Sequence, residues 1–517
     1  MKSVMEHSFS KAPTADMPRS SFDRSHGLKT TLDAGNLVPV FLDEVLPGDT
    51  VSLNPTMFAR VNTLLYPIMD NMFLDVHFFF VPYRQVWDNF RKFCGEQADP
   101  NDSTDYVVPT VNLMQGTFSE QSLGDYLGLP INAQGLEVSD LPFRAYNHIY
   151  NEWYRDQNLV DTVYFSKTDT ATYQTYQFQI HKRGKRHDYF TSCLPWPQKG
   201  DSVQLPLGNS APVVGVNEDI TMTTENGRLG TISEASQTVK IGTSAGTASD
   251  LRWTNTALEA DLSSATASTV NELRRSFQIQ KLLERDARSG TRYSEIVNAH
   301  FGVNFMDVTY RPEYLGGSSS PLQTEAIPLT GQGSSYYNVA TGDLAAMGTI
   351  TCQGGGFTKS FTEHGVVMGI ASIRADLTYQ QGVNRMWSRQ TRYDFYWPAL
   401  AHIGEQAVLN KEIYKATDGK DDDVFGYQER WSEYRYKPSQ ITGKMRSTAN
   451  SSLDAWHLSQ EFATRPELNK TFIEENPPVD RVVAIQNEPN FHMDCYFNYT
   501  CARPMPMYSV PGLIDHF

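Results

Sequence analysis

Two apolar, aromatic-rich runs near opposite ends of the chain dominate its pattern of hydrophobic and polar positions. Residues 72–81 are almost continuously apolar and end at Pro82. The run is too short to cross a bilayer, so it predicts a strand buried on both faces. Its polar residues Asp75 and His77 are two positions apart and therefore point the same way. Residues 491–506 repeat this character. We expect the first and last parts of the chain to share one β core, with insertions between them.

Shorter apolar patterns predict additional strands and helices around this core. Residues 32–55 contain short apolar runs broken by glycine and proline, which predicts strands and turns, and residues 365–379 predict further short strands. Apolar residues spaced by three and four predict helices over 85–94 and 141–159. An aromatic stripe on the second helix is more typical of core packing than of a cofactor site.

A pair of helices is predicted over residues 269–303. Thr269 and Glu272 have the spacing of a capping box, and the first helix is expected to stop near Ser289-Gly290. Its apolar residues do not form one clean stripe, so we expect it to be covered on more than one side. Five arginines are assigned to pairs between subunits or within the chain, in preference to catalysis: Arg274, Arg275, Arg285, Arg288 and Arg292.

Two segments differ from the rest in composition. Residues 1–30 are polar and predict an extended N-terminal arm, either an internal or intersubunit tether or a disordered terminus. Residues 201–268 are rich in Ser, Thr, Gly, Ala and Asn and predict a long surface insertion, where recognition residues are often found. Gly242–Gly246 fits the G-x-S-x-G pattern of a hydrolase, but it lacks the required strand-to-helix context.

Composition favours a β protein that contacts other protein. Hydrophobic residues make up 40% of the chain and aromatic residues 12%, which favours many strands joined by turns. Only 20% of residues are charged, as expected if much of the surface meets copies of the same chain. The formal net charge of -15 argues against a chain that is wholly a nucleic-acid-binding module.

The most basic segment is a candidate for local contact with nucleic acid. It contains Lys182, Arg183, Lys185 and Arg186, with aromatic residues close by at 189, 190 and 196. Stacking of bases on aromatic rings together with attraction to phosphates is how proteins bind single strands. The alternative is a solvated loop or a salt-bridge site between subunits.

No catalytic or cofactor motif stands out. There is no H-E-x-x-H, Walker A or Rossmann pattern, so we expect no catalysis, cofactor or metal site. The carboxylates of Asp421, Asp422 and Asp423 lie in a turn-like run, where a solvated loop is the better interpretation, although a metal there stays open. A glycan-binding or glycan-cleaving β-sandwich is the alternative function. The five cysteines predict free core thiols, and without a signal peptide or transmembrane run we expect synthesis in the cytosol.

Long strings of the sequence resemble the major capsid protein of the Microviridae, small icosahedral single-stranded DNA phages, and are most similar to the gokushovirus branch. The resemblance extends from end to end except in residues 201–268. It rests on residues 20–50 (SSFDRSHGLKTTLDAGNLVPVFLDEVLPGDT), 187–201 (HDYFTSCLPWPQKGD), 273–303 (LRRSFQIQKLLERDARSGTRYSEIVNAHFGV) and 501–517 (CARPMPMYSVPGLIDHF).

The resemblance implies a mainly β fold, a viral jelly roll with eight antiparallel strands and long helical and loop insertions, formed by residues 31–517 as one domain. It also implies pentamers that close into a T=1 shell of 60 copies around circular single-stranded DNA. The insertion 201–268 would form the threefold protrusion and contribute to host attachment. Implied partners are the chain itself, the genomic DNA, a small basic DNA-packaging protein, pilot or minor virion proteins and a host surface receptor. The protein would reside in the virion after assembly in the bacterial cytoplasm.

Overall fold

The structure is a computed structural model that describes residues 18–112, 118–170, 178–203, 270–304, 309–328, 330, 342 and 344–508, together with the backbone of six short strands between 213 and 260. The chain divides into two units. The first comprises residues 1–197 and 289–517, and the second comprises residues 198–288.

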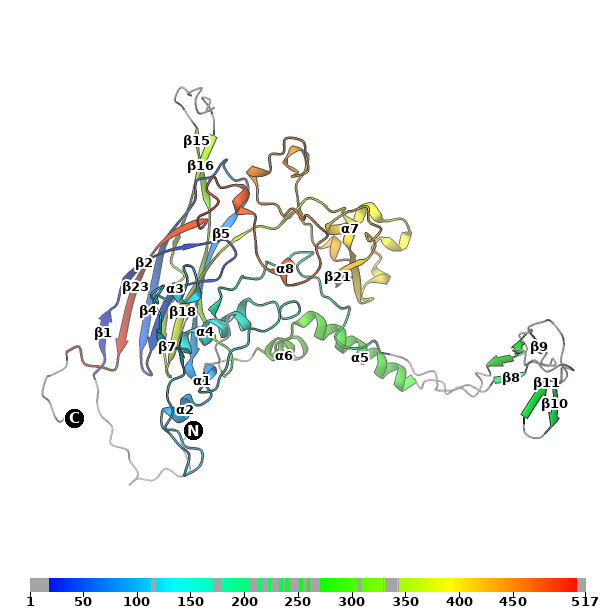
Figure 1. The fold of residues 1–517 in the computed structure, drawn as a ribbon, viewed down its shortest axis with the longest axis horizontal. Coiled ribbons are helices and arrows are strands. Elements are labelled where there is room, and N and C mark those ends of the chain that lie inside the picture. The colour runs from blue at the N-terminus through cyan, green and yellow to red at the C-terminus, as the bar shows by residue number, and fades with distance from the viewer. Residues whose placement is uncertain are drawn as a thin grey trace. The chain divides into compact units, whose positions relative to one another are not determined.

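A seven-stranded sheet in the first unit joins the two ends of the chain (Figure 1). β4 (Thr50–Val61) and β23 (Phe491–Arg503) pair antiparallel along almost their whole lengths, from Thr50 opposite Ala502 to Val61 opposite Phe491. Both strands alternate buried and exposed residues, as expected for a sheet with one covered face. The prediction that the two chain ends share one β core is confirmed.

A four-stranded antiparallel sheet has the order β14-β5-β18-β3. Its strands are β14 (Glu313–Pro321), β5 (Met72–Pro82), β18 (Gly365–Ala375) and β3 (Val38–Val45). All residues of β18 are buried, as are all but Phe73 and His77 of β5. The strand predicted over 72–81 is therefore confirmed. The short strands predicted over 365–379 are one long strand and β19 (Thr378–Tyr379).

Two hydrophobic clusters explain why the central strands are buried on both faces. Leu74, Val76 and Phe78 of β5 pack with residues of β4 and β23 between the sheets. Phe79 and Val81, on the opposite face of β5, pack with helix α4 and Trp87. The described part of this unit therefore has three layers: the seven-stranded sheet, the four-stranded sheet and a helical layer.

The helical layer differs from the expected helices in length. Helix α4 (Leu141–Ile149) continues as a π-helical turn over Tyr150–Tyr154 and ends there, although the pattern predicted a helix to residue 159. The Asp156 side chain accepts hydrogen bonds from the backbone N–H groups of residues 158 and 159, which replaces helical pairing with a turn.

The helix predicted over 85–94 is two short helices, α1 (Tyr83–Val86) and α2 (Phe90–Phe93). Trp87 lies between them with extended backbone and a fully buried side chain, and its Nε1 donates to Asp169 at 2.7 Å. Burial of this indole outweighs local helix propensity.

The remaining strands complete the sheets and form smaller ones. The seven-stranded sheet also contains β1 (Ser20–Asp23), β2 (His26–Leu32), β15 (Gln323–Pro328), β16 (Leu344–Gln353) and β17 (Phe357–Ser360). Smaller two-stranded sheets contain β6 (Thr110–Asn112), β7 (Glu137–Ser139), β20 (Glu405–Leu409), β21 (Val424–Glu429) and β22 (Ser439–Gln440). The other helices of this unit are α3 (Leu123–Tyr126), α6 (Tyr293–Phe301), α7 (Asn410–Ile413) and α8 (Lys470–Ile473).

Residues 18–30, the described part of the predicted arm, run extended along β23. β1 and β2 both pair antiparallel with this strand, from Ser20 opposite Arg503 to Leu32 opposite Phe491. Residues 1–17 lie outside the described part of the chain.

Residues 376–490 form an insertion between β18 and β23, drawn in yellow to orange in Figure 1. The insertion has its own hydrophobic cluster. Tyr379, Val408, Ile413 and Phe425 pack there with residues from the segment 189–193. The strands β20 and β21 are too short for their alternation to stand out in the sequence.

The second unit contains helix α5 (Val270–Ser289) and three antiparallel strand pairs. The pairs are β8 (Val213–Gly215) with β13 (Leu258–Ala260), β9 (Met222–Thr224) with β12 (Leu251–Trp253), and β10 (Ile232–Ala235) with β11 (Thr238–Ile241). The helix pair predicted over 269–303 is confirmed as α5 and α6, although Thr269 of the predicted capping box lies outside the described residues, as do residues 242–246. In the described part of the chain, no helix has the length and apolar character to span a membrane.

Candidate interaction sites

The basic segment 181–187 lies against the four-stranded sheet. Asn36 and Lys182 form an isolated β-bridge, and Gly184 forms another with Glu474. Arg183 reaches β5, where its guanidinium lies 2.7 Å from the Asp75 carboxylate, and it also donates to the Ser372 hydroxyl at 2.9 Å. Arg183 therefore fastens the segment to the sheet.

Asp75 is the centre of a buried ionic cluster. Its carboxylate also accepts from Arg374 at 2.8 Å and from the Ser319 hydroxyl at 2.5 Å. Burial raises the pKa of Asp75, but the Ser319 hydrogen bond and the charges of Arg183 and Arg374 outweigh burial, so the pKa lies below its ordinary value. The carboxylate stays ionised, as its two cationic partners require.

Lys185 is also buried. Its ammonium donates to the Phe472 carbonyl and to Gln460 Oε1, and it lies 4.6 Å from the Phe472 ring centroid. Burial lowers the pKa of Lys185 to about 8, although the negative charges of Glu475 and Asp188 act in the opposite direction. This lysine joins the segment to α8 and is not presented to solvent.

The structure therefore divides the four predicted nucleic-acid residues into two groups. The Arg183 and Lys185 side chains are occupied by buried partners, whereas Arg186 is exposed and Lys182 is half-buried, with its ammonium 2.5 Å from Asn476 Oδ1. A sequence pattern cannot distinguish these groups, because both have the same charge and spacing. Contact with DNA stays a prediction, and the exposed side chains are the ones that can make it.

A cavity of 410 Å³ beside this segment brings Arg292, one of the predicted arginines, next to Arg155, which the sequence analysis did not single out. The aromatic side chains of Trp153, Tyr154 and Tyr314 also line the cavity. Burial and the charge of Arg292 lower the pKa of Arg155. These residues come from the π-helical turn after α4, from the start of α6 and from β14, so their proximity left no signal in the sequence.

The predicted arginines of the helix pair also differ in environment. Arg274, Arg275, Arg285 and Arg288 on α5 are exposed. Arg292, which precedes α6, lies 3.4 Å from Glu152 and 3.0 Å from Glu295, and it donates to the Asn151 carbonyl. Arg292 therefore pairs within its own chain, one of the two alternatives expected for these residues.

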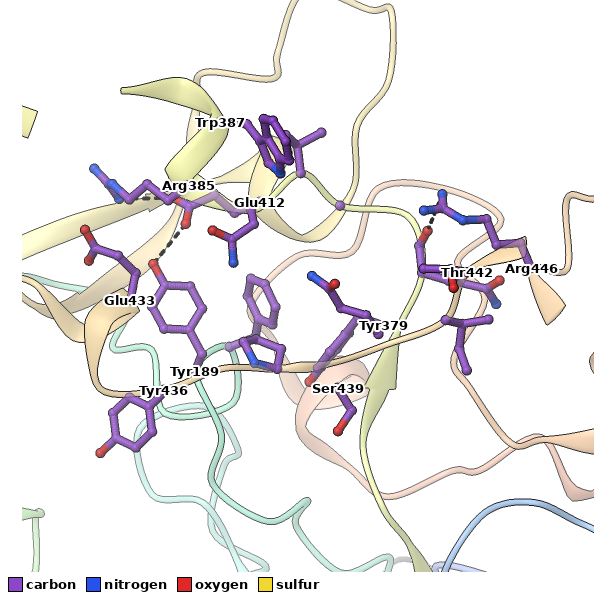
Figure 2. A pocket seen from close by; sticks show the side chains of 18 residues that line it. Tyr189, Tyr379, Arg385, Trp387, Glu412, Glu433, Tyr436, Ser439, Thr442 and Arg446 are labelled. Atoms are coloured by element: carbon purple, nitrogen blue, oxygen red, sulfur yellow. Dashed lines mark hydrogen bonds and ion pairs between the residues drawn. The ribbon is translucent and has the colours of Figure 1, made fainter. Parts of the chain in front are cut away.

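A second cavity, of 440 Å³, lies in the insertion 376–490 (Figure 2). Tyr189, Phe190 and Tyr379 form its inner wall, and Trp387 and Tyr436 are exposed residues that line it. Tyr189 and Phe190 follow the basic segment directly in the sequence. In the structure their side chains line this cavity together with residues of the insertion 376–490.

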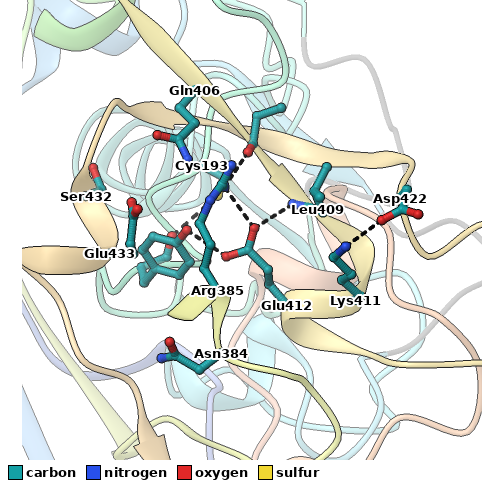
Figure 3. Close-up of polar contacts among 12 residues, drawn as sticks. Cys193, Asn384, Arg385, Gln406, Leu409, Lys411, Glu412, Asp422, Ser432 and Glu433 are labelled. Carbon is teal, nitrogen blue, oxygen red and sulfur yellow. Dashed lines mark hydrogen bonds and ion pairs between the residues drawn. The ribbon is translucent and has the colours of Figure 1, made fainter. Parts of the chain in front are cut away.

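Arginine–carboxylate pairs organise this cavity (Figure 3). Arg385 donates to the Ala407 carbonyl at 2.8 Å and lies 3.0 Å from the Glu412 carboxylate, which also accepts from the Leu409 N–H and the Tyr189 hydroxyl. Burial raises the pKa of Glu412, while the charge of Arg385 opposes the rise. Glu433 lies 3.4 Å from Arg389. Each carboxylate is held by an arginine, an arrangement suited to fixing loops and not to proton transfer.

The acidic run 421–423 lies in a turn between α7 and β21. Asp421 pairs with Lys415 and Arg465, and Asp422 lies 2.6 Å from Lys411. The side-chain hydrogen bond from Lys415 is the main reason that the pKa of Asp421 is lowered. These contacts agree with the solvated-loop interpretation. All five cysteines are free, with Cys94 exposed and the other four buried.

Comparisons with known proteins identify the family. Residues 10–513 match the family described as capsid protein (F protein). The chain is 46% identical to capsid protein VP1 of Bdellovibrio phage phiMH2K, over 99% of this chain and 98% of the relative. It is 43% identical to capsid protein VP1 of Chlamydia phage 1, over 99% and 98%, and 35% identical to capsid protein VP1 of Spiroplasma virus 4, over 98% and 97%.

These matches extend over almost the whole length of this chain and of each relative, so they cover both sheets, the insertion 376–490 and the helix pair. The chain belongs to the capsid protein (F protein) family of the Microviridae and is a structural, non-enzymatic component of a bacteriophage virion of the gokushovirus type.

Proposed function

We propose that this major capsid protein assembles through pentamers into a T=1 shell of 60 copies around circular single-stranded DNA. The family match over residues 10–513 is the observation that carries the proposal. Closed point-group symmetry repeats each contact around the shell, so interfaces that are weak one by one stabilise the whole particle.

The strand order supports a jelly roll as the framework of this shell. Successive strands β3, β4 and β5 alternate between the four-stranded and the seven-stranded sheet, and the chain crosses again between β14 and β15 and between β17 and β18. All pairings in the two sheets are antiparallel, and the two sheets share one core. Two antiparallel sheets with repeated crossings are typical of the jelly roll.

Electron microscopy after sedimentation tests the assembly proposal. The expressed chain, with and without its neighbouring phage proteins, is expected to give closed particles of uniform diameter with bumps at the threefold axes. A stable monomer under both conditions would contradict the proposal and would favour the alternative function, a glycan-binding or glycan-cleaving β-sandwich.

We further propose that Lys182 and Arg186 contribute to DNA contact inside the shell, together with a small basic packaging protein that neutralises part of the DNA charge, because this chain itself has a net charge of -15. A Lys182→Ala/Arg186→Ala chain is expected to form particles with less DNA, measured by the ratio of absorbance at 260 and 280 nm. Unchanged DNA content in intact particles would exclude this role. Glu474→Gln, at the residue that follows α8 and forms an isolated β-bridge with Gly184 of this segment, is the matched control for a local surface change.

The insertion 201–268 is proposed to form the threefold protrusion and to contact the host surface receptor, while pilot or minor virion proteins complete the particle. Most of its residues lie outside the described part of the chain. Deletion of its tip is expected to leave particles intact and abolish attachment to host cells. Loss of assembly would instead make the insertion part of the shell.

A further inference from the structure

An aromatic patch covers part of the insertion 376–490. Its seven rings belong to two stretches of the insertion, and each is at least 48% exposed. Monomeric proteins rarely expose large contiguous apolar patches, so such a surface indicates a binding partner. The patch consists of Trp387, Tyr393, Phe395, Tyr396, Trp397, Tyr434 and Tyr436.

Two arginines contact four of the seven rings, those of Tyr393, Phe395, Trp397 and Tyr434. The Arg389 guanidinium carbon lies 4.3 Å from the Tyr434 ring centroid and 5.5 Å from that of Phe395. Arg392 lies 5.3 Å from the Tyr393 centroid, and its carbonyl accepts a hydrogen bond from Trp397 Nε1 at 2.8 Å. The patch is therefore preformed. Tyrosine, tryptophan and arginine are also the residues that contribute most at protein interfaces.

The 440 Å³ cavity opens within this patch, because Trp387 and Tyr436 belong to both (Figure 2). The short strands β19 and β22 line it and pair only with each other in the described part of the chain. A third extended segment can pair with the edge of such a sheet and place its side chains in the cavity.

The charges around the cavity favour an acidic side chain on the segment that pairs with the sheet edge. Arg385 and Arg389 are paired with Glu412 and Glu433. Arg446, which also lines the cavity, is exposed; it donates to the Gln380 carbonyl at 3.3 Å and has no acidic partner among the residues that the structure describes. An acidic side chain on the incoming segment would complete this pair.

The area of the patch fits a subunit contact. Seven rings of roughly 150–250 Å² each, about half exposed, leave on the order of 700 Å² of ring surface uncovered. One partner in a standard interface contributes about 800 Å². A small ligand would fill the cavity but leave most of this ring surface in water, whereas a protein surface covers both.

We propose that the aromatic patch and its cavity form a subunit interface, in which a second copy of this chain covers the rings and inserts an acidic, extended segment into the cavity. The inference rests on the proposed shell and names one contact within it.

Photo-crosslinking tests the identity of the occupant. The full chain with p-benzoylphenylalanine at Tyr436 is expected to give, in assembled particles, a covalent product of twice the chain mass that peptide mapping assigns to two copies. Crosslinking to DNA or to another virion protein, or no crosslink in intact particles, would overturn the proposal. Particles that form normally without the crosslink would leave the shell proposal standing.

A variant gives an independent measurement. Trp387→Ser/Tyr436→Ser is expected to weaken association at least about thirtyfold, as truncated hot-spot residues do, with an unchanged melting temperature. Tyr496→Ser, which removes a 55% exposed ring from β23, is the control. Association equal to wild type in the double variant, or an equal loss in the control, would contradict an interface at this patch. Arg446→Glu is expected to weaken association as well.

Discussion

Single buried charges hold distant segments of this capsid protein together. The Asp75 carboxylate of β5 meets Arg374 of β18 and Arg183 of the basic segment, and the side chains of Asp75 and Arg374 are at most 5% exposed. In such a setting the carboxylate does not add much stability over an apolar residue, but its removal takes away the shared counter-charge of Arg183 and Arg374 and leaves Arg374 with only Asp376, at 3.7 Å.

Asp75→Asn is therefore expected to lower the free energy of unfolding by about 3–5 kcal/mol, because the amide N–H group would face two arginines. Chemical denaturation followed by tryptophan fluorescence measures the change. Asp494→Asn, which removes the exposed partner of Lys29, is the control and is expected to cost at most about 1 kcal/mol.

The loss of unfolding free energy in Asp75→Asn should depend on pH. The pKa of Asp75 is lowered in the folded protein from an ordinary value of 3.8, so its contribution is complete above about pH 4 and is lost as the pH falls through the lower folded pKa. The difference between wild type and Asp75→Asn should shrink in that acidic range. A difference independent of pH would show that the effect is steric.

Two histidines with lowered pKa values, His148, which is buried, and His181, which is half-buried, predict a second, less acidic transition. Burial lowers the pKa of His148 from 6.5 to about 3 and that of His181 to about 4. The unfolded chain therefore binds more protons below pH 6.5, and the free energy of unfolding should fall by up to about 1.4 kcal/mol per pH unit for each histidine between pH 6.5 and 4.

Unfolding measured across this range should give a shallower slope for His181→Asn than for wild type. The exposed His402, which has a positive φ that asparagine tolerates, provides His402→Asn as the control for an exposed histidine. An unchanged slope in His181→Asn would contradict a neutral His181.

At the level of elements, β23 buries alternate residues, unlike β5, although the sequence suggested the same character for both strands. Its odd-numbered residues from 491 to 501 are buried and its even-numbered residues from 492 to 500 are exposed. Phe497 is fully buried, with its ring 5.2 Å from that of Phe41 in the facing sheet, whereas Tyr496 is 55% exposed. Adjacent residues of one strand therefore contribute very differently to stability.

Phe497→Ala is expected to destabilise the fold by about 3–5 kcal/mol, because it removes buried area and leaves a cavity between the sheets. Thermal and chemical unfolding measure the effect. Tyr496→Ala is the matched variant and should change stability by less than about 1 kcal/mol. Equal losses in the two variants would contradict the register of β23.

At the level of the whole molecule, α5 is a long helix with little of its surface buried within its own unit. Of its 20 residues only Ala287 is buried, and Phe277 and Leu282 are exposed. From the scattered apolar residues of this helix, the sequence analysis predicted that other protein surfaces cover it on more than one side. We infer that other copies provide this cover in the shell, with the exposed arginines of α5 at the contacts.

Arg274→Glu/Arg275→Glu is therefore expected to reduce particle yield by about tenfold or more, since about 1.4 kcal/mol at a contact is a factor of ten and symmetry repeats the loss. Sedimentation measures the yield, and the melting temperature of the unassembled chain should not change. Arg292→Glu is the contrast: it breaks pairs with Glu152 and Glu295 and should lower that melting temperature. Normal yield in the α5 variant would exclude these arginines from a contact.

The sequence by itself determined the elements that local signals mark. The continuous apolar run of β5 predicted a strand buried on both faces, and the Ser289-Gly290 pair marked the end of α5, because glycine commonly ends a helix. The family could also be recognised from long strings of residues. Such signals are local and are carried by the order of residues.

Only the tertiary structure decided which charges and rings are available to partners. Arg183 and Arg186 look alike in the sequence, yet Arg183 is fixed to Asp75, 108 residues away, and Arg186 faces solvent. The cavity below the aromatic patch likewise joins residues 189–190 to the insertion 376–490. The physical reason is that local spacing governs secondary structure, whereas burial of a charge or an aromatic ring depends on residues that approach from distant parts of the chain.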